Sequence, residues 1–139
     1  MNRIRKTDDF ISELSIVAEE NSLIVGHVLF SKVKLIADGR ERKGLSLAPV
    51  AVLPEKQKHG IGRCLIEEGI FSARHLGFEA ILVLGDPKYY ARFGFEHHLT
   101  QKISSPYSCE HYAGLELITG ALQNFESATV EYPAAFSVV

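Results

Sequence analysis

The sequence has few cysteines, and this shortage excludes two classes of small protein. Cys64 and Cys109 are the only 2 cysteines in 139 residues, and neither forms a C-x-x-C pair or stands at a metal-ligand spacing from histidine. A structural zinc site and a disulfide framework both need several such residues at characteristic spacings. We therefore expect no metal, no disulfide and a reducing, cytoplasmic location.

An excess of one charge and a long apolar run are also lacking. The chain has 15 Lys and Arg against 17 Asp and Glu, so it lacks the general basic field that nucleic-acid binding requires. The apolar run Ala80–Leu84 is far shorter than the roughly 18 residues of a membrane-spanning candidate. Acidic residues follow the basic start MNRIRKTDD, where a signal peptide would need its apolar core. We expect a soluble protein that binds neither nucleic acid nor membrane.

The apolar content predicts one domain over residues 1–139, because 46% apolar residues in a chain of this length suffice for a single core. Two β-rich stretches, Leu14–Ala18 and Leu23–Phe30, predict a hairpin that turns at Asn21 and Ser22. A polar loop is predicted over Asp38–Gly44, before another β-prone stretch, Leu45–Leu53. Pro49 lies inside that stretch and predicts a bulge or a gap in the pairing.

A helix is predicted after this strand, with a stop at Gly77. Its apolar positions recur at three- and four-residue spacing: Ile61, Leu65, Gly69, Ala73 and Leu76. The buried run Ala80–Leu84 then predicts a strand parallel to Leu45–Leu53. Next we expect a short helix that starts at Asp86 and Pro87 and stops at Gly94, followed by a strand that opens at Phe95. The segments LELIT and SATVEY are weaker strand candidates.

The corner VLPEKQKHGIGRCLI joins the predicted strand to the predicted helix. Gly60 and Gly62 leave a tight loop without side chains, and four basic residues surround it: Lys56, Lys58, His59 and Arg63. Unpaired N–H groups at a helix N-terminus, aided by the helix dipole, favour an anion such as phosphate or pyrophosphate. The alternative is a tight turn with solvated lysines. A P-loop string is absent, and a dinucleotide fingerprint would need a third glycine where Leu65 stands.

The string Q-x-x-G-x-G after V-x-P resembles the acetyl-CoA loop of the GNAT superfamily of N-acetyltransferases. YYARFGF is similar to the Y-x-x-x-G-F segment of that superfamily, and LGDPKYYARFGF resembles a bacterial subgroup with a G-D-P-x-Y-Y run. The order of predicted elements from about Asp8 to Phe95 also matches. The resemblance implies an α/β (α+β) fold with a mixed, mostly antiparallel central sheet flanked by helices. In it, a bulged strand splays from its parallel neighbour, and the N-terminal strand-helix unit is short or missing here.

The resemblance also implies a binding site for acetyl-CoA as acetyl donor. Backbone amides would hold the pyrophosphate, with Lys58 and His59 beside them, and main-chain groups of the bulged strand would pair with the pantetheine arm. The implied cofactor-binding residues are Val50, Ala51, Val52, Gln57, Lys58, His59, Gly60, Ile61, Gly62, Arg63 and Tyr90. The Val52 N–H would stabilise the oxyanion, and Tyr90 would protonate the departing thiolate. Tyr89 points about 100° away on a helix, so the family spacing selects Tyr90.

The resemblance assigns no general base. Five residues are candidates only by residue type: His27, His97, His98, Glu110 and His111. We expect an N-acetyltransferase that acts directly on a primary amine of a small molecule or peptide. A non-catalytic acyl-CoA-binding or sensing module is the alternative, and a phosphate-binding scaffold is a third reading. Because only Met1–Phe10 precedes the predicted hairpin, Leu14–Ala18 would be a sheet edge. That edge predicts a homodimer near Phe10, Leu14 and Ile16, unless the chain is a truncation.

Overall fold

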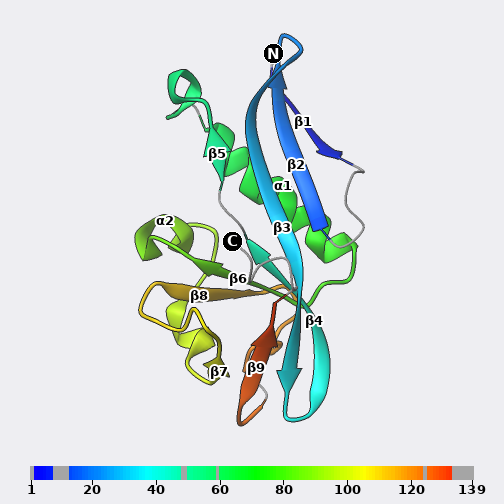
Figure 1. The fold of residues 1–139 in the computed structure, drawn as a ribbon, viewed down its shortest axis with the longest axis vertical. Coiled ribbons are helices and arrows are strands. Elements are labelled where there is room, and N and C mark those ends of the chain that lie inside the picture. The colour runs from blue at the N-terminus through cyan, green and yellow to red at the C-terminus, as the bar shows by residue number, and fades with distance from the viewer. Residues whose placement is uncertain (1, 8–12, 48–49, 59, 124, 133–139) are drawn as a thin grey trace. The chain divides into compact units, whose positions relative to one another are not determined.

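The computed structural model describes residues 2–7, 13–47, 50–58, 60–123 and 125–132, with the backbone alone for 2–7 and 13–14. These residues form two compact units (Figure 1). Unit 1 consists of Met1–Ser31 and Leu47–Leu76, and unit 2 of Lys32–Ser46 and Gly77–Val139. No helix among the described residues is long and apolar enough to cross a membrane. A single domain over 1–139 stays a prediction.

Unit 1 is built on the predicted hairpin. Strand β2 (Glu13–Glu20) pairs antiparallel with β3 (Leu23–Ala37), and the turn lies at Asn21 and Ser22 with positive φ angles of 52° and 67°. Two consecutive residues of positive φ match the right-handed twist of the strands that they connect. The predicted hairpin is therefore confirmed.

A strand that the sequence did not predict precedes this hairpin. Strand β1 (Asn2–Thr7) pairs antiparallel with β2, from Asn2 opposite Glu20 to Thr7 opposite Ser15. The expectation that Leu14–Ala18 forms a sheet edge is therefore wrong, because β1 covers that edge. The homodimer loses the reason given for it, and Phe10 lies outside the described residues.

Helix α1 (Ile61–His75) packs on the hairpin through its apolar face. Its buried residues are Ile61, Leu65, Ile66, Gly69, Ile70, Ser72 and Ala73. Gly69 permits the closest approach, because a Cβ there would lie 2.1 Å from Phe30 Cε1 in β3. Gly77, with φ of 86°, follows the C-terminal end as predicted. Leu76 was expected on the buried face, but it is 54% exposed because the helix has already ended.

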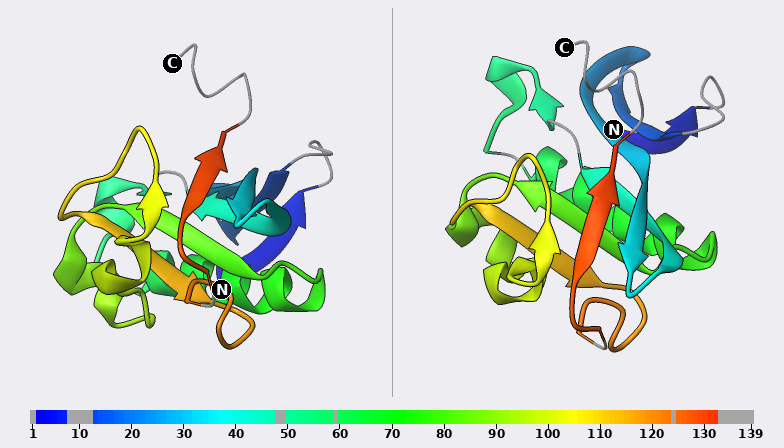
Figure 2. Two further views of the ribbon diagram at one scale, coloured as in Figure 1. Left: turned by 90° about the horizontal axis from the view of Figure 1, so that it is seen from below. Right: turned by 60° about the horizontal axis from the view of Figure 1, so that its bottom comes forward.

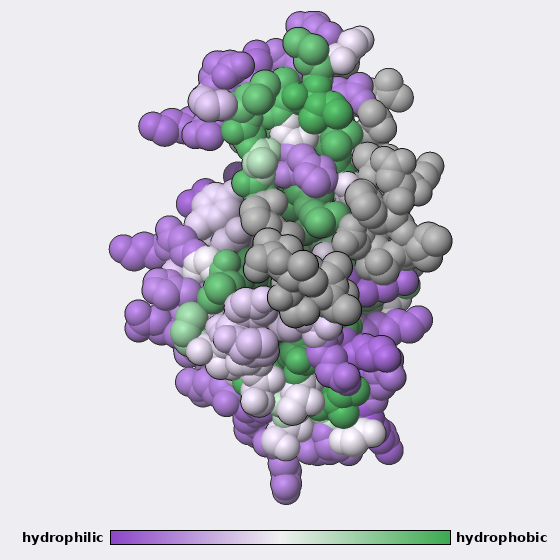
Figure 3. Space-filling model, viewed as in Figure 1, coloured by the Kyte–Doolittle hydropathy of each residue, from purple (hydrophilic) through white to green (hydrophobic). Residues whose placement is uncertain are grey.

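The turn end of the hairpin carries apolar surface. Leu23 and Ile24 beside the turn are 67% and 54% exposed, and Figure 3 shows apolar surface gathered over this part of unit 1. Helix η1 (Pro54–Lys56), a single 3₁₀ turn, lies near this end because Lys56 bonds Glu20. Unit 1 thus brings the segment before α1 to the turn end of β2 and β3.

The polar loop predicted over Asp38–Gly44 is wrong. Strand β3 continues to Ala37 and β4 (Arg40–Leu47) begins at Arg40, so only Asp38 and Gly39 form the turn, with φ angles of 49° and 80°. An Asp-Gly pair is a strong signal for this tight hairpin turn. The predicted strand Leu45–Leu53 is divided, because β4 ends at Leu47 and the next strand, β5, spans Ala51–Val52. Pro49 itself lies outside the described residues.

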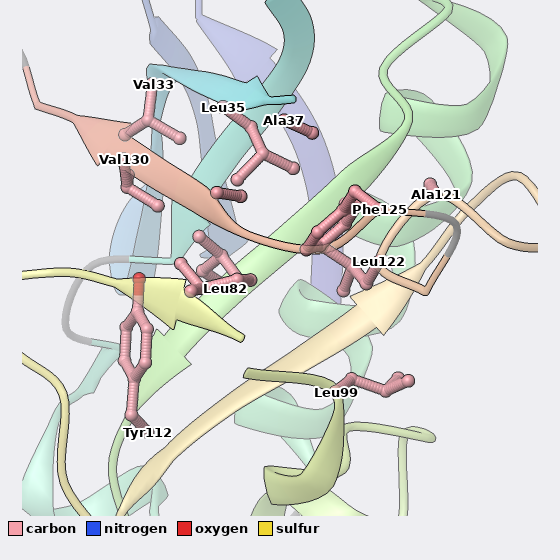
Figure 4. Close-up of a cluster of buried hydrophobic side chains, with 13 residues drawn as sticks. Val33, Leu35, Ala37, Leu82, Leu99, Tyr112, Ala121, Leu122, Phe125 and Val130 are labelled. Carbon is pink, nitrogen blue, oxygen red and sulfur yellow. The ribbon is translucent and has the colours of Figure 1, made fainter. Parts of the chain in front are cut away.

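Unit 2 places β6 (Ala80–Leu84) beside β4, and β8 (Tyr112–Glu116) antiparallel to β6. Strand β9 (Ala128–Glu131) pairs with residues 34–37 of β3 and with β7 (Ile103–Ser104), as Figure 2 shows. The strands predicted at Ala80–Leu84 and within SATVEY are confirmed, while LELIT overlaps only the end of β8. Side chains from five strands (β3, β6, β7, β8 and β9), from Leu99 and from the segment before β9 form one apolar cluster (Figure 4).

The segment after β6 follows the prediction up to Gly94. Helix α2 spans Pro87–Ala91, with Asp86 as N-cap, and Gly94 has φ of 95°. The strand expected at Phe95 is absent from this described stretch: Glu96 forms one isolated bridge with Gly114, and η2 (His97–Thr100) follows. Phe95 is 2% exposed, so its apolar character reflects burial rather than strand pairing.

Candidate functional site

Strand β5 offers one edge for pairing. It pairs antiparallel with β3, with Val52 opposite Gly26, and the Leu53 N–H donates to Val25 O at 2.9 Å. Successive N–H groups of a strand point to opposite sides, so the Val52 N–H points away from β3. Among the described strands, β5 pairs only with β3. An extended ligand could therefore add to the far edge of β5.

The loop after β5 turns into α1 through a glycine of left-handed conformation. Gly60 is the N-cap residue with φ of 81°, and no side chain caps the helix there. The first backbone bond of the helix runs from Cys64 N–H to Gly60 O at 3.0 Å. The N–H groups of Ile61, Gly62 and Arg63 consequently lack intrahelical acceptors. The first turn of α1, which is described throughout, holds no acidic side chain, so the dipole attracts an anion without competition.

Polar side chains around this loop have different tasks. Gln57 Nε2 donates to Val52 O at 3.1 Å and so ties the loop back to β5. Arg63 lies 3.5 Å from Glu67 on the exposed surface of α1, a kind of pair that contributes little. Lys56 bonds Glu20, whereas the exposed Lys58 makes no hydrogen bond or ion pair within the described part of the chain. Of these, Lys58 is the charge most available to a bound anion.

Tyr90 in α2 packs closely over a glycine. A Cβ at Gly85 would lie 2.6 Å from Tyr90 Cε2, so only glycine allows this position of the ring. Phe95 and Tyr89 meet the ring edge-on, with centroids at 5.8 Å and 5.1 Å. Burial, and then the neighbouring Tyr89, raise the pKa of Tyr90 above its usual 10.0. The phenol therefore stays protonated at neutral pH, as a proton donor must.

Tyr89 has a more superficial environment. Its ring lies edge-on to Phe93 at 5.6 Å, and the Arg92 guanidinium sits 4.9 Å from its centroid. Asp86 Oδ1 accepts a hydrogen bond from Lys88 N–H at 3.0 Å, so Asp86 has the capping role expected of it.

The candidate bases have other partners. His27 Nε2 lies 2.8 Å from Ser15 Oγ in unit 1. In unit 2, His97 Nδ1 lies 2.7 Å from Tyr112 O, while His98 and His111 lie 3.4 Å and 3.5 Å from Glu96 and Glu110. These contacts single out none of them as the base.

The predicted site residues divide between the two units. Unit 1 holds Val50, Ala51, Val52, Gln57, Lys58, Gly60, Ile61, Gly62 and Arg63, whereas Tyr90 belongs to unit 2. His59 lies outside the described residues. Sequence reasoning missed Glu20, Ser15 and Gly85, which contact Lys56, His27 and Tyr90. Only the Gly85–Tyr90 spacing is short enough for the sequence to have suggested it.

A family model described as an acetyltransferase (GNAT) domain matches residues 12–97. The chain belongs to the GNAT acetyltransferase family. It is 33% identical over 96 residues to the uncharacterized N-acetyltransferase YhbS of Escherichia coli K12, which covers 67% of this chain and 56% of YhbS. It is 40% identical over 83 residues to YjhQ of the same organism, covering 60% of this chain and 46% of YjhQ. The chain thus spans about half the length of these GNAT relatives.

Two solved GNAT structures resemble this fold. The YhbS structure from E. coli, in complex with CoA, has a TM-score of 0.78 and 31% identity, covering 89% of this chain and 69% of that one. A GNAT acetyltransferase from Brucella melitensis, in complex with acetyl-CoA, has a TM-score of 0.68 and 36% identity, covering 88% and 68%. The mixed α/β fold expected from the sequence is confirmed. The subgroup with the G-D-P-x-Y-Y run stays a prediction.

Proposed function

We propose that this GNAT protein is an acetyl-CoA-dependent N-acetyltransferase that transfers acetyl directly to a primary amine of a small molecule or peptide. The N-terminus of α1 carries the proposal: three N–H groups without intrahelical acceptors follow a left-handed glycine, next to the open edge of β5. This arrangement suits a ligand with a pyrophosphate and an extended, amide-containing arm. The complexes of its two relatives with CoA and acetyl-CoA support the same assignment.

In the proposed binding mode, backbone amides of Gln57, Gly60, Ile61, Gly62 and Arg63 hold the pyrophosphate, flanked by Lys58 and His59. The pantetheine arm pairs with main-chain groups of Val50, Ala51 and Val52. The outward N–H of Val52 then donates to the thioester oxygen, where a single fixed donor can contribute about 3 kcal/mol to the transition state.

In the proposed reaction, the amine nitrogen attacks the thioester carbonyl and forms a C–N bond. The carbonyl oxygen becomes an oxyanion that the Val52 N–H stabilises, and the C–S bond then breaks. Tyr90 donates its phenolic proton to the departing thiolate and then regains a proton from water. The amine proton leaves to water or to a base that we do not assign. No covalent acyl-enzyme is needed, and exposed Cys64 takes no part.

Release of free thiol from acetyl-CoA across a panel of primary amines tests the proposal. The panel should contain polyamines, amino sugars, free amino acids and lysine peptides, with reactions lacking protein or amine as controls for spontaneous hydrolysis. Amine-dependent thiol release and an N-acetyl product identified by mass spectrometry are the expected results. Tight acetyl-CoA binding with no product from any amine would instead favour a non-catalytic acyl-CoA-binding module.

A further inference from the structure

An ion pair joins the glycine-loop segment to the hairpin. Lys56 Nζ, in η1, donates to Glu20 Oε1 at the end of β2 at 2.5 Å. The two side chains are 32% and 24% exposed, so the pair is only partly open to solvent. It connects positions 36 residues apart and thus fixes η1 against a different part of unit 1.

The segment that follows η1 needs such support because its backbone is strained. Lys58 has φ of 66°, a left-handed conformation that residues with a Cβ disfavour. Strained backbone persists only where the surrounding structure holds it in place. Gly60 has φ of 81°, but glycine adopts this angle without strain. The loop conformation is therefore intrinsically unfavourable at Lys58.

The other described hydrogen bonds of this segment are local. Lys56 N–H donates to Leu53 O at 2.8 Å, and Gln57 N–H to Pro54 O at 3.3 Å. The Gln57 side chain reaches back only to Val52 O. These bonds shape the turn, and the Leu53 N–H bond to Val25 O anchors its start to β3. The contact between Lys56 and Glu20 adds a second anchor, to the end of β2.

We propose that Glu20 is a positioning residue for the acetyl-CoA site: by holding Lys56, it keeps Gln57, Lys58 and Gly60 in the conformation that receives the pyrophosphate. The inference rests on the proposed function. It assigns Lys56 a tethering role in place of a contact with cofactor phosphate. A loop ordered before the cofactor arrives loses less entropy on binding, so the tether raises affinity.

The sign of one measurement separates this tether from simple electrostatics. If electrostatics alone mattered, Glu20→Gln would strengthen phosphate binding, because it removes a negative charge near the anion site and releases Lys56. If Glu20 acts as a tether, the same substitution weakens phosphate binding. Glu55→Gln is the matched control, because Glu55 is an exposed neighbour in the same 3₁₀ turn and makes no ion pair within the described residues.

The experiment measures acetyl-CoA affinity by calorimetry for the parent, Glu20→Gln, Glu55→Gln and the charge-exchanged variant Glu20→Lys/Lys56→Glu. We expect Glu20→Gln to bind about three- to five-fold more weakly, close to the upper range for a surface ion pair because this one is partly buried. Glu55→Gln should bind as the parent or slightly more tightly. The exchanged pair should recover most of the lost affinity. It has no cation at position 56, so its recovery argues against a Lys56–phosphate contact. Urea unfolding of each variant checks that the fold is retained.

Each outcome has a definite meaning. Equal or tighter binding by Glu20→Gln, or failure of the exchanged pair to recover affinity, would overturn the tether and leave the proposed function intact. If the parent itself does not bind acetyl-CoA, the proposed function fails, and this inference fails with it.

Discussion

The residues that pack around the Tyr90 ring favour the protonated phenol that its proposed role requires. Gly85 leaves room for the ring and Phe95 covers its edge, so the phenol is partly removed from water. This burial is the main reason that the pKa of Tyr90 lies above 10.0. A proton donor of this kind is fully protonated throughout the physiological range. No loss of activity below about pH 10 should come from ionisation of Tyr90.

Tyr90→Phe should lower kcat by about 100-fold or more while leaving acetyl-CoA affinity nearly unchanged, because the hydroxyl acts on the leaving thiolate. Steady-state kinetics with an accepted amine and calorimetry with acetyl-CoA give the two quantities separately. Tyr89→Phe is the control and should change kcat much less. An equal loss in both variants would show that the pair contributes packing rather than proton transfer.

At the scale of elements, local sequence patterns predicted the hairpin, α1 and β6. Each of these three signals depends on residues close together in the sequence: the turn at Asn21 and Ser22, the apolar spacing of α1 and the apolar run Ala80–Leu84. The misses have equally local causes. Five charged residues within Asp38–Gly44 obscured the Asp38–Gly39 turn, because the start of β4 is mostly exposed and a strand of charged residues resembles a loop in sequence. Strand β1 lacks apolar alternation, and it forms a strand because it pairs with β2.

A buried phenol in β8, that of Tyr112, forms a hydrogen bond with the segment that follows β9. Tyr112 is 1% exposed, and its hydroxyl lies 3.0 Å from that of Tyr132, just after β9. Burial, and then the neighbouring Tyr132, raise the pKa of Tyr112 well above 10.0. Well below pH 10 the phenol is protonated in the folded and unfolded chain alike, so it adds no pH dependence there. Above pH 10 only the unfolded chain releases the proton, and stability falls as pH rises.

Tyr112→Phe should therefore flatten the loss of stability between pH 10 and pH 11.5. One such phenol contributes a slope of up to about 1.4 kcal/mol per pH unit. Urea unfolding at several pH values measures this slope, and the variant should also lose about 1 kcal/mol at pH 7 with its hydrogen bond. Tyr89→Phe, whose ring packs against Phe93 rather than against Tyr112 or Tyr132, is the control and should keep a slope close to that of the parent. An unchanged slope in Tyr112→Phe would show that the buried phenol ionises freely.

At the scale of the whole molecule, the sequence predicted the glycine loop and the tyrosine but not what supports them. The loop is a short string in which Gly60, Gly62 and the following helix lie within a few positions, so its pattern is readable. Glu20 holds Lys56 across 36 positions, and no spacing rule links two such residues. The same holds for Ser15 and His27, which meet only because β2 pairs with β3.

The central claim is that α1 presents its N-terminus to acetyl-CoA, and calorimetry with Gly60→Val tests it most directly. A side chain at this position would stand among the amides that bind the pyrophosphate. Gly77→Val is a matched control at the other end of the same helix: its φ of 86° is close to the 81° of Gly60, and a Cβ at either glycine would meet open space. Both variants should lose similar stability, but only Gly60→Val should lose acetyl-CoA binding. Parent-like affinity in a folded Gly60→Val would contradict the account.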